Sequence, residues 1–203
     1  MSQDNKSSAS SSLKSEIVYQ PPLDFTFKCL TSVPDCLEED PRQKGNAISN
    51  HPLQPPNSSS SQRPIHRTKG IRFSNNVIND WRDFSATLNS LIDNPGETLE
   101  WIDMSFNDLP CISPCLLEYK NLRVLYLHGN GLEKLSEVDK LGKLPFLKNL
   151  TLHGNPMEET DGYRHYVLSR IPQLENLDFS GVTKSDRACS ERWRQRGKRS
   201  GTK

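Results

Sequence analysis

The chain has few cysteines and no long apolar run. Its five cysteines are scattered, odd in number and without a Cys-x-x-Cys pair, which argues against a disulfide framework and against a zinc site. No apolar run approaches the ~20 residues that a membrane-spanning helix needs, and the N-terminus is rich in Ser, Asp and Lys rather than built like an export signal. The sequence therefore predicts a cytoplasmic protein with reduced cysteines and no membrane contact.

Recognisable catalytic motifs are also missing. The chain has no glycine-rich phosphate loop, no Gly-x-Ser-x-Gly, no His-Glu-x-x-His and no dinucleotide-binding fingerprint. We therefore expect no catalytic residues, no cofactor and no metal site, and hence a protein that is not an enzyme.

Apolar residues are scarce in the first third of the chain. Only 33% of the 203 residues are hydrophobic, and residues 1–67 hold eight of the 14 prolines together with several serine runs. This composition predicts a disordered or extended arm over residues 1–67. Near residues 21–27 the arm carries a docking segment, which comprises Pro21, Pro22, Leu23, Phe25 and Phe27. Two alternatives remain open: the segment binds a partner, or it lies back on the chain's own folded domain.

The rest of the chain is dominated by a repeat. The pattern Leu-x-x-Leu-x-Leu-x-x-Asn-x-Leu is complete in residues 99–109, 122–132 and 147–157, and incomplete copies occupy residues 71–78 and 174–182. This is the unit of a leucine-rich repeat, in which each coil must stack on its neighbours to bury its apolar face. The sequence predicts an α/β solenoid of about five coils over residues 68–183. A parallel β-sheet should form its concave face, and short helices or 3₁₀ turns its convex face.

The repeat also predicts what lies inside each coil. The asparagine positions are filled by Asn76, Asn107, Asn130 and Asn155. An inward amide supplies donors and an acceptor to the turns of adjacent coils, so we expect these four side chains to form a buried ladder. In the last copy the pattern places Phe179 among the inward apolar residues.

Helical segments are expected outside the strands. Trp81, Phe84, Leu88 and Leu91 recur at helical spacing after Asn79, a predicted N-cap. Residues 184–203 should form a cap helix and a basic tail, because Thr183-x-x-Asp186 resembles a capping box and this segment carries a net charge of +6. The basic side chains of the tail include Arg192, Arg194, Arg196, Lys198 and Arg199.

A narrower resemblance follows from longer stretches of sequence. The segments Gly154-Asn155-Pro156-Met157 and Leu177-Asp178-Phe179 resemble the C-terminal cap of the repeat class that includes the spliceosomal A-prime protein and the leucine-rich light chain of outer-arm dynein. Residues 20–194, including residues 101–109, 124–130 and 150–159, resemble the leucine-rich repeat-containing protein 51 family. The resemblance implies a cytoplasmic repeat protein that is not an enzyme. It also suggests a place in a cytoskeletal assembly such as a ciliary axoneme, where relatives with this cap are found.

Outward strand positions are the expected binding surface of a solenoid. The predicted partner-binding residues are Arg72, Trp101, Asp103, Phe106, Val124, Tyr126, His128, Thr151, His153 and Asp178. Large aromatic side chains inside a polar rim are typical of protein-binding hot spots. His128 and His153 lie one coil apart, but the other residues of their column are serines, which leaves no third metal ligand.

Two functions remain after these exclusions. The first is a protein-interaction adaptor, whose basic tail suits an acidic surface such as tubulin. The second is a ribonucleoprotein component. Nucleic-acid binding would need a basic concave face, whereas residues 68–183 carry 11 basic and 16 acidic residues, a net charge of −5. The sequence therefore favours the adaptor.

Overall fold

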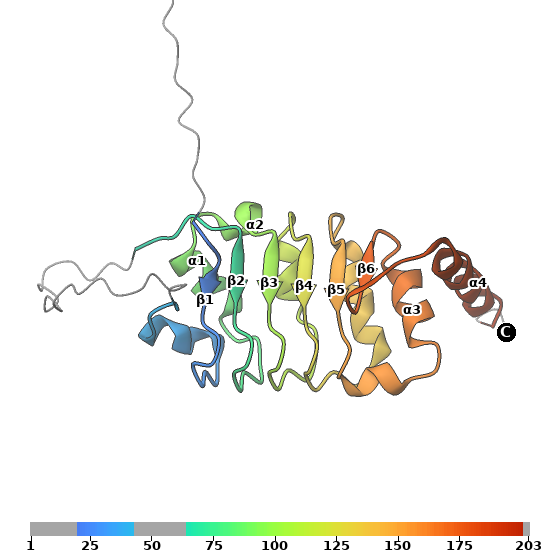
Figure 1. The fold of residues 1–203 in the computed structure, drawn as a ribbon, viewed down its shortest axis with the longest axis horizontal. Helices are drawn as coiled ribbons and strands as arrows, with labels where there is room; N and C mark the ends of the chain where they lie inside the picture. The colour runs from blue at the N-terminus through green and yellow to red at the C-terminus, as the bar shows by residue number, and fades with distance from the viewer. Residues whose placement is uncertain (1–19, 43–63, 201–203) are drawn as a thin grey trace, which may run out of the picture.

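The computed structural model describes residues 20–42 and 64–200, which form a single stack of coils (Figure 1). Seven strands lie side by side in chain order. Strands β1 (Leu23–Asp24), β2 (Gly70–Arg72), β3 (Trp101–Asp103), β4 (Val124–Tyr126), β5 (Asn149–Thr151) and β6 (Asn176–Leu177) run parallel. The last strand, β7 (Ser180–Gly181), pairs antiparallel with β6. The predicted α/β leucine-rich repeat solenoid is confirmed.

Equivalent residues of the repeat face one another across the sheet. Ile71 pairs with Ile102, Ile102 with Leu125, Leu125 with Leu150, and Leu150 with Leu177. All five side chains are buried, and they form one continuous core with the other repeat leucines. Burial of the same position in each coil explains why a short strand recurs wherever the pattern occurs.

Short helices cover the other side of the sheet (Figure 1). They are α1 (Phe84–Leu91), α2 (Pro95–Thr98), the 3₁₀ segments η2 (Pro114–Glu118), η3 (Leu135–Lys143) and η4 (Pro156–Glu159), and α3 (Tyr163–Arg170). The predicted start of the first helix at Asn79 is wrong. Asp83 has a left-handed backbone with φ of 52°, so the regular helix begins only at Phe84. Trp81 lies before the helix, where its indole N–H donates to the carbonyl of Cys111 at 2.8 Å.

The segment near residues 21–27 lies on the chain's own solenoid. Strand β1 pairs with β2, and the ring of Phe25 is fully buried and stacked on Phe73 with centroids 5.5 Å apart. The 3₁₀ segment η1 (Val33–Glu38) adds buried Val33 to the same core. Residues 20–42 therefore build an additional first coil, inside the range predicted to be an arm. Residues 64–67 of that range also lie against the stack, where the N–H of His66 donates to the carbonyl of Leu91 at 2.7 Å. Residues 1–19 and 43–63 lie outside the described residues.

The C-terminal end differs from a sixth regular coil. Asp178 and Phe179 both have positive φ (52° and 58°) and make a two-residue turn between β6 and β7. This turn directs Phe179 outward, where it is 65% exposed, so its predicted place in the core is wrong. Helix α4 (Lys184–Ser200) follows, and it begins with reciprocal bonds between Thr183 and Asp186: the Thr183 N–H donates to the carboxylate, and the Asp186 N–H donates to the hydroxyl.

Four asparagines connect the coils inside the turns. Each side-chain oxygen accepts a backbone N–H of the preceding coil, as Asn130 does from Leu109 at 3.0 Å. Each amide nitrogen donates to carbonyls of its own coil and of the preceding coil; for Asn130 these belong to Leu127 and Met104, both at 3.0 Å. The same pattern holds at Asn76, Asn107 and Asn155. These bonds satisfy backbone groups that would otherwise be buried without partners.

Candidate functional site

The strand face carries the predicted partner-binding residues, but they differ in how far solvent reaches them. Phe106 is exposed. Arg72, Trp101, Val124, Tyr126, His153 and Asp178 are partly buried. Asp103, His128 and Thr151 are buried, with at most 9% of their surface exposed. A partner docking on this face would therefore meet chiefly the aromatic and aliphatic side chains, with the buried residues beneath them.

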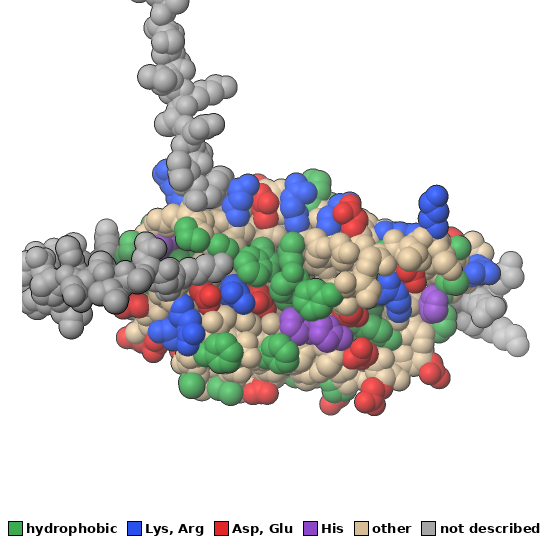
Figure 2. Space-filling model, viewed as in Figure 1, with side chains coloured by type: hydrophobic (Ala, Val, Ile, Leu, Met, Phe, Trp, Pro, Cys, Tyr) green, Lys and Arg blue, Asp and Glu red, His purple; other side chains and the backbone are tan. Residues whose placement is uncertain are grey.

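Aromatic rings run across the face in contact with one another. Trp101 and Tyr126 have ring centroids 6.1 Å apart, and Tyr126 and Phe179 lie 5.5 Å apart. Phe106 lies 4.9 Å from His128, which also touches Phe179 at 5.7 Å. We call this set, completed by His153, the aromatic row. Figure 2 shows hydrophobic side chains gathered in the middle of this face, with histidines beside them and Lys and Arg along one border.

Two members of the aromatic row stand at positions that normally suit glycine or asparagine. The residue before the ladder asparagine has a left-handed backbone in each of four coils: Asn75, Phe106, Gly129 and Gly154, with φ between 52° and 69°. Phe106 carries a large side chain there, as does Phe27 (φ of 55°) at the equivalent position of the first coil, and Phe179 is left-handed as well. A bulky residue in this region costs about 1 kcal/mol or more. The rings of Phe106 and Phe179 are also more than half exposed, so burial in the core does not explain their presence.

The ring of Phe106 lies over the next coil. A Cβ atom placed on Gly129 would come within 2.6 Å of the Phe106 ring. Glycine is therefore required at position 129 for two reasons: it permits the left-handed backbone of the turn, and it leaves room for the ring of Phe106.

His128 and His153 stack on each other, with centroids 4.6 Å apart and ring planes inclined by 9°. The Nδ1 atom of His128 lies 2.7 Å from the hydroxyl of Thr151, and that of His153 lies 3.4 Å from a carboxylate oxygen of Asp178. Burial, followed by repulsion from His153, lowers the pKa of His128. Within residues 20–42 and 64–200, no three His, Cys, Asp or Glu side chains are grouped to hold a metal ion. The pair packs beneath Phe179 and Phe106 as part of the surface.

The two aspartates of the face are engaged internally. Asp103 accepts bonds from the backbone N–H and the hydroxyl of Ser105, at 3.0 and 2.6 Å. Asp178 accepts the backbone N–H groups of Leu152 and His153, and the hydroxyl of Tyr163. Burial and this carboxylate raise the pKa of Tyr163. The aspartates therefore support the shape of the face, and the sequence had no means of showing that their oxygens would be occupied.

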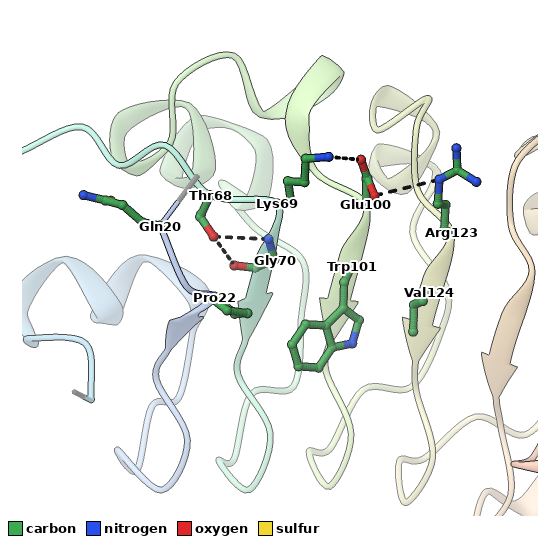
Figure 3. Close-up of a pocket in the computed structure, with 9 residues that line it drawn as sticks. All are labelled: Gln20, Pro22, Thr68, Lys69, Gly70, Glu100, Trp101, Arg123 and Val124. Atoms are coloured by element: carbon green, nitrogen blue, oxygen red, sulfur yellow. Dashed lines mark hydrogen bonds and ion pairs between the residues drawn. The ribbon is translucent and has the colours of Figure 1, made fainter. Parts of the chain in front are cut away.

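Trp101 lies between two hollows at the end of the face that begins with β1. Its ring crosses Gly70, where an added Cβ would approach the indole to 2.9 Å and Pro22 to 3.3 Å. The first hollow, about 300 Å³, is lined by Pro22, Trp101 and Val124, and Lys69, Glu100 and Arg123 border it (Figure 3). The second, about 410 Å³, lies on the β1 side and includes Asp24, Arg42, His66 and Arg72. Sequence reasoning missed these hollows because residues 20–42 had been assigned to the arm.

The basic tail forms helix α4, which packs on α3 beyond the last strand (Figure 1). The ring of Trp193 stacks near His165 at 6.2 Å. Arg194 pairs with Glu191 in the same helix at 2.8 Å, and Arg192 bonds to Cys189. Of the other predicted tail residues, Arg196, Lys198 and Arg199 belong to the helix, but their side chains lie outside the described part of the structure. In the described part of the chain, no helix has both the length and the apolar character required to cross a bilayer.

Comparison with known proteins identifies the family. The family described as leucine-rich repeat matches residues 97–202. Leucine-rich repeat-containing protein 51 of Mus musculus is 47% identical over 180 residues, covering 89% of this chain and 88% of the relative. The Homo sapiens protein of that name is 46% identical over 178 residues, covering 88% and 87%. Among solved structures, a chain of the Drosophila melanogaster SNF/U2A′ complex gives a TM-score of 0.52 at 27% identity, over 62% of this chain and 68% of that chain. The chain belongs to the leucine-rich repeat-containing protein 51 family.

Proposed function

We propose that the protein is a non-enzymatic adaptor that binds a protein partner through the aromatic row of its strand face. The observation that carries the proposal is the pair Phe106 and Phe179. Both rings are more than half exposed on left-handed backbone, an arrangement that costs stability and is offset inside the fold only by contacts with other rings of the same surface. Exposed aromatic anchors contribute to association far more than to the core.

Charge favours a protein partner over nucleic acid. Arg72 on β2 is a basic residue of the strand face. The outward positions of β4 to β6 carry no basic residue; they are Val124, Tyr126, Asn149, Thr151 and Asn176. A phosphate backbone running along the face would meet no cation on these strands. One solved structure that resembles this chain is part of the SNF/U2A′ complex, so a similar solenoid takes part in a complex. The resemblance of the C-terminal cap to that of the leucine-rich light chain of outer-arm dynein supports a finer proposal, that the adaptor serves a cytoskeletal assembly such as an axoneme.

Photo-crosslinking from defined positions tests the binding face. The photoreactive residue benzoylphenylalanine would replace Phe179 or Phe106 in the full chain, and Arg82 in a control. Arg82 has an exposed side chain and stands just before α1, on the helix side of the molecule. After irradiation in cells that express the protein, we expect both face positions to form the same crosslinked product and the control position to form none.

A second measurement separates binding from folding. The double variant Trp101→Ala with Tyr126→Ala should lose that product while it keeps the circular dichroism spectrum and nearly the melting temperature of the parent. An identical product from position 82, or a product that survives the double substitution, would show that the strand face is not the binding surface. For the finer proposal, a tagged chain should co-localise with axonemes in ciliated cells, and exclusion from cilia would reject it.

A further inference from the structure

The hollows beside Trp101 combine an apolar floor with a basic border. Pro22, Trp101 and Val124 provide the apolar surface of the first hollow. Four cationic side chains line the two hollows, Arg42, Lys69, Arg72 and Arg123, against two carboxylates, Asp24 and Glu100. This local excess of positive charge stands in a solenoid of net charge −5. The cations are thus concentrated at one end of the face.

The carboxylates present do not balance these cations. Glu100 is shared, since one oxygen lies 2.8 Å from Lys69 and the other 3.8 Å from Arg123. Arg123 keeps 56% of its side chain exposed. On the other side of Trp101, Arg72 has two carboxylates, Asp24 at 3.4 Å and Asp103 at 3.6 Å. Arg42 has its guanidinium over the ring of Phe27 and no carboxylate within ion-pair distance among residues 20–42 and 64–200. A ligand carboxylate at either border would therefore meet a cation that is only partly neutralised.

We propose that this end of the face binds an acidic, extended peptide segment of the partner, an inference that rests on the proposed function of the strand face. An apolar side chain of the segment enters the first hollow beside Trp101 and Val124. Carboxylates on either side of it pair with Arg123 and with Arg42. Strands lie about 4.8 Å apart, so the path from β1 to β4 is about 14 Å, a length that four or five extended residues cover. The recognised segment is correspondingly short, with acidic residues flanking one apolar residue.

A short peptide fits this charge distribution better than RNA does. The basic border continues past Arg123 to Lys148, whose ammonium pairs with Glu175 at 2.9 Å, whereas the strand face beyond β4 carries Asp178 and uncharged residues. A nucleic acid long enough to bind by its phosphates would extend over that part of the face without cations to meet it. An acidic peptide of four or five residues needs only the two borders of the hollows.

Selection from a random peptide library tests the inference. The full chain would be immobilised and offered a displayed library of 12-residue peptides, and the recovered peptides would be sequenced. We expect enrichment of peptides with Asp or Glu on both sides of a single apolar residue. Recovery of basic or neutral sequences, or no enrichment over bare support, would overturn the proposal.

Variants and salt then locate the site. The most enriched peptide would be titrated by fluorescence anisotropy against the parent, against Arg42→Gln with Arg123→Gln, and against Arg82→Gln. Arg82 is an exposed arginine paired with Asp80, away from the hollows. We expect the double variant to weaken binding at least fivefold, Arg82→Gln to leave it unchanged, and 300 mM KCl to weaken it relative to 50 mM. Equal affinity of the double variant and the parent would reject the site.

Two further arms make the result specific. A 12-nucleotide uridine RNA should bind more weakly than the peptide, and tighter RNA binding would reject the peptide as the ligand. The crosslinked product from Phe179 reports on the proposed function independently. If the Phe179 product persists while no acidic peptide binds, the strand face binds its partner by other contacts. The proposed function then stands, and only the acidic-peptide inference is rejected.

Discussion

Removal of one rung of the asparagine ladder should destabilise the whole stack. In Asn130→Ala, the buried N–H of Leu109 loses its acceptor at 3.0 Å, and the carbonyls of Met104 and Leu127 each lose one donor at 3.0 Å. Both carbonyls keep a second donor, the amide of Asn107 at 3.1 Å and that of Asn155 at 3.0 Å, so only the N–H of Leu109 is left without a partner. Leaving a buried group without a partner costs about 1–3 kcal/mol. We therefore expect a loss of about 2 kcal/mol, a large share of the roughly 5–15 kcal/mol that stabilises a typical domain.

Urea unfolding followed by far-UV circular dichroism measures this loss, with thermal unfolding as a second assay. For a folded part of this size, about 2 kcal/mol corresponds to a fall in melting temperature of roughly 4–8 °C. The matched control is Asn121→Ala, because Asn121 makes a single exposed bond, from its amide to the carbonyl of Glu97 at 2.7 Å. If Asn130→Ala proved as stable as Asn121→Ala, the ladder would not be a source of stability and the reasoning would fail.

Three further predictions address other parts of the fold. Phe25→Ala should cost about 3–4 kcal/mol in chemical unfolding, because the ring is fully buried against Phe73; a neutral result would show that the first coil adds nothing to the core. Gly129→Ala should lower the melting temperature through its φ of 65° and its clash with Phe106, and Phe106→Ala in the same chain should restore part of the loss; no restoration would contradict the contact. The hydrogen bond that Arg164 donates to Asp186 holds the pKa of this carboxyl far below its usual range. The stability that results should be present at pH 7 and be lost as the pH falls below about 4. The unfolding free energies of the parent and of Asp186→Asn should therefore converge in acid. A difference that stays constant with pH would show that ionisation of Asp186 does not contribute to stability.

The sequence predicted those parts of the fold in which a repeated position has one physical role. Leu125 and Leu150 must be inward in every coil, and Asn130 must satisfy the same turn groups in every coil, so a pattern match carries over directly to the structure. The first coil lacks this signal. Lys28 stands where the other coils have asparagine, and its backbone N–H donates to Asn76 of the next coil instead. An apolar strand without its asparagine in a proline-rich stretch is indistinguishable by composition from a docking segment.

The candidate site was harder to predict for a different reason. Pattern alone told which side chains point outward from a strand, but not which of them turn onto a neighbour. Trp101 lies across Gly70, and the positive φ of Phe179 reverses its direction relative to Leu177. Both outcomes depend on contacts between coils, which are decided by tertiary packing and leave no trace in the spacing of one repeat.

The antiparallel strand β7 sets the length of the array. Parallel coils present the same backbone groups at each end, so an uncovered end would accept the strand of another molecule as readily as its own next coil. At the C-terminal end the chain turns back after Asp178 and Phe179 and pairs β7 with β6, which reverses the direction that an incoming coil would need. At the other end the N–H of Arg42 donates to the carbonyl of Asp24 in β1 at 2.6 Å. Within the described residues, each edge of the sheet therefore has a backbone partner from the chain itself, which limits the pairing left open to a strand of another molecule.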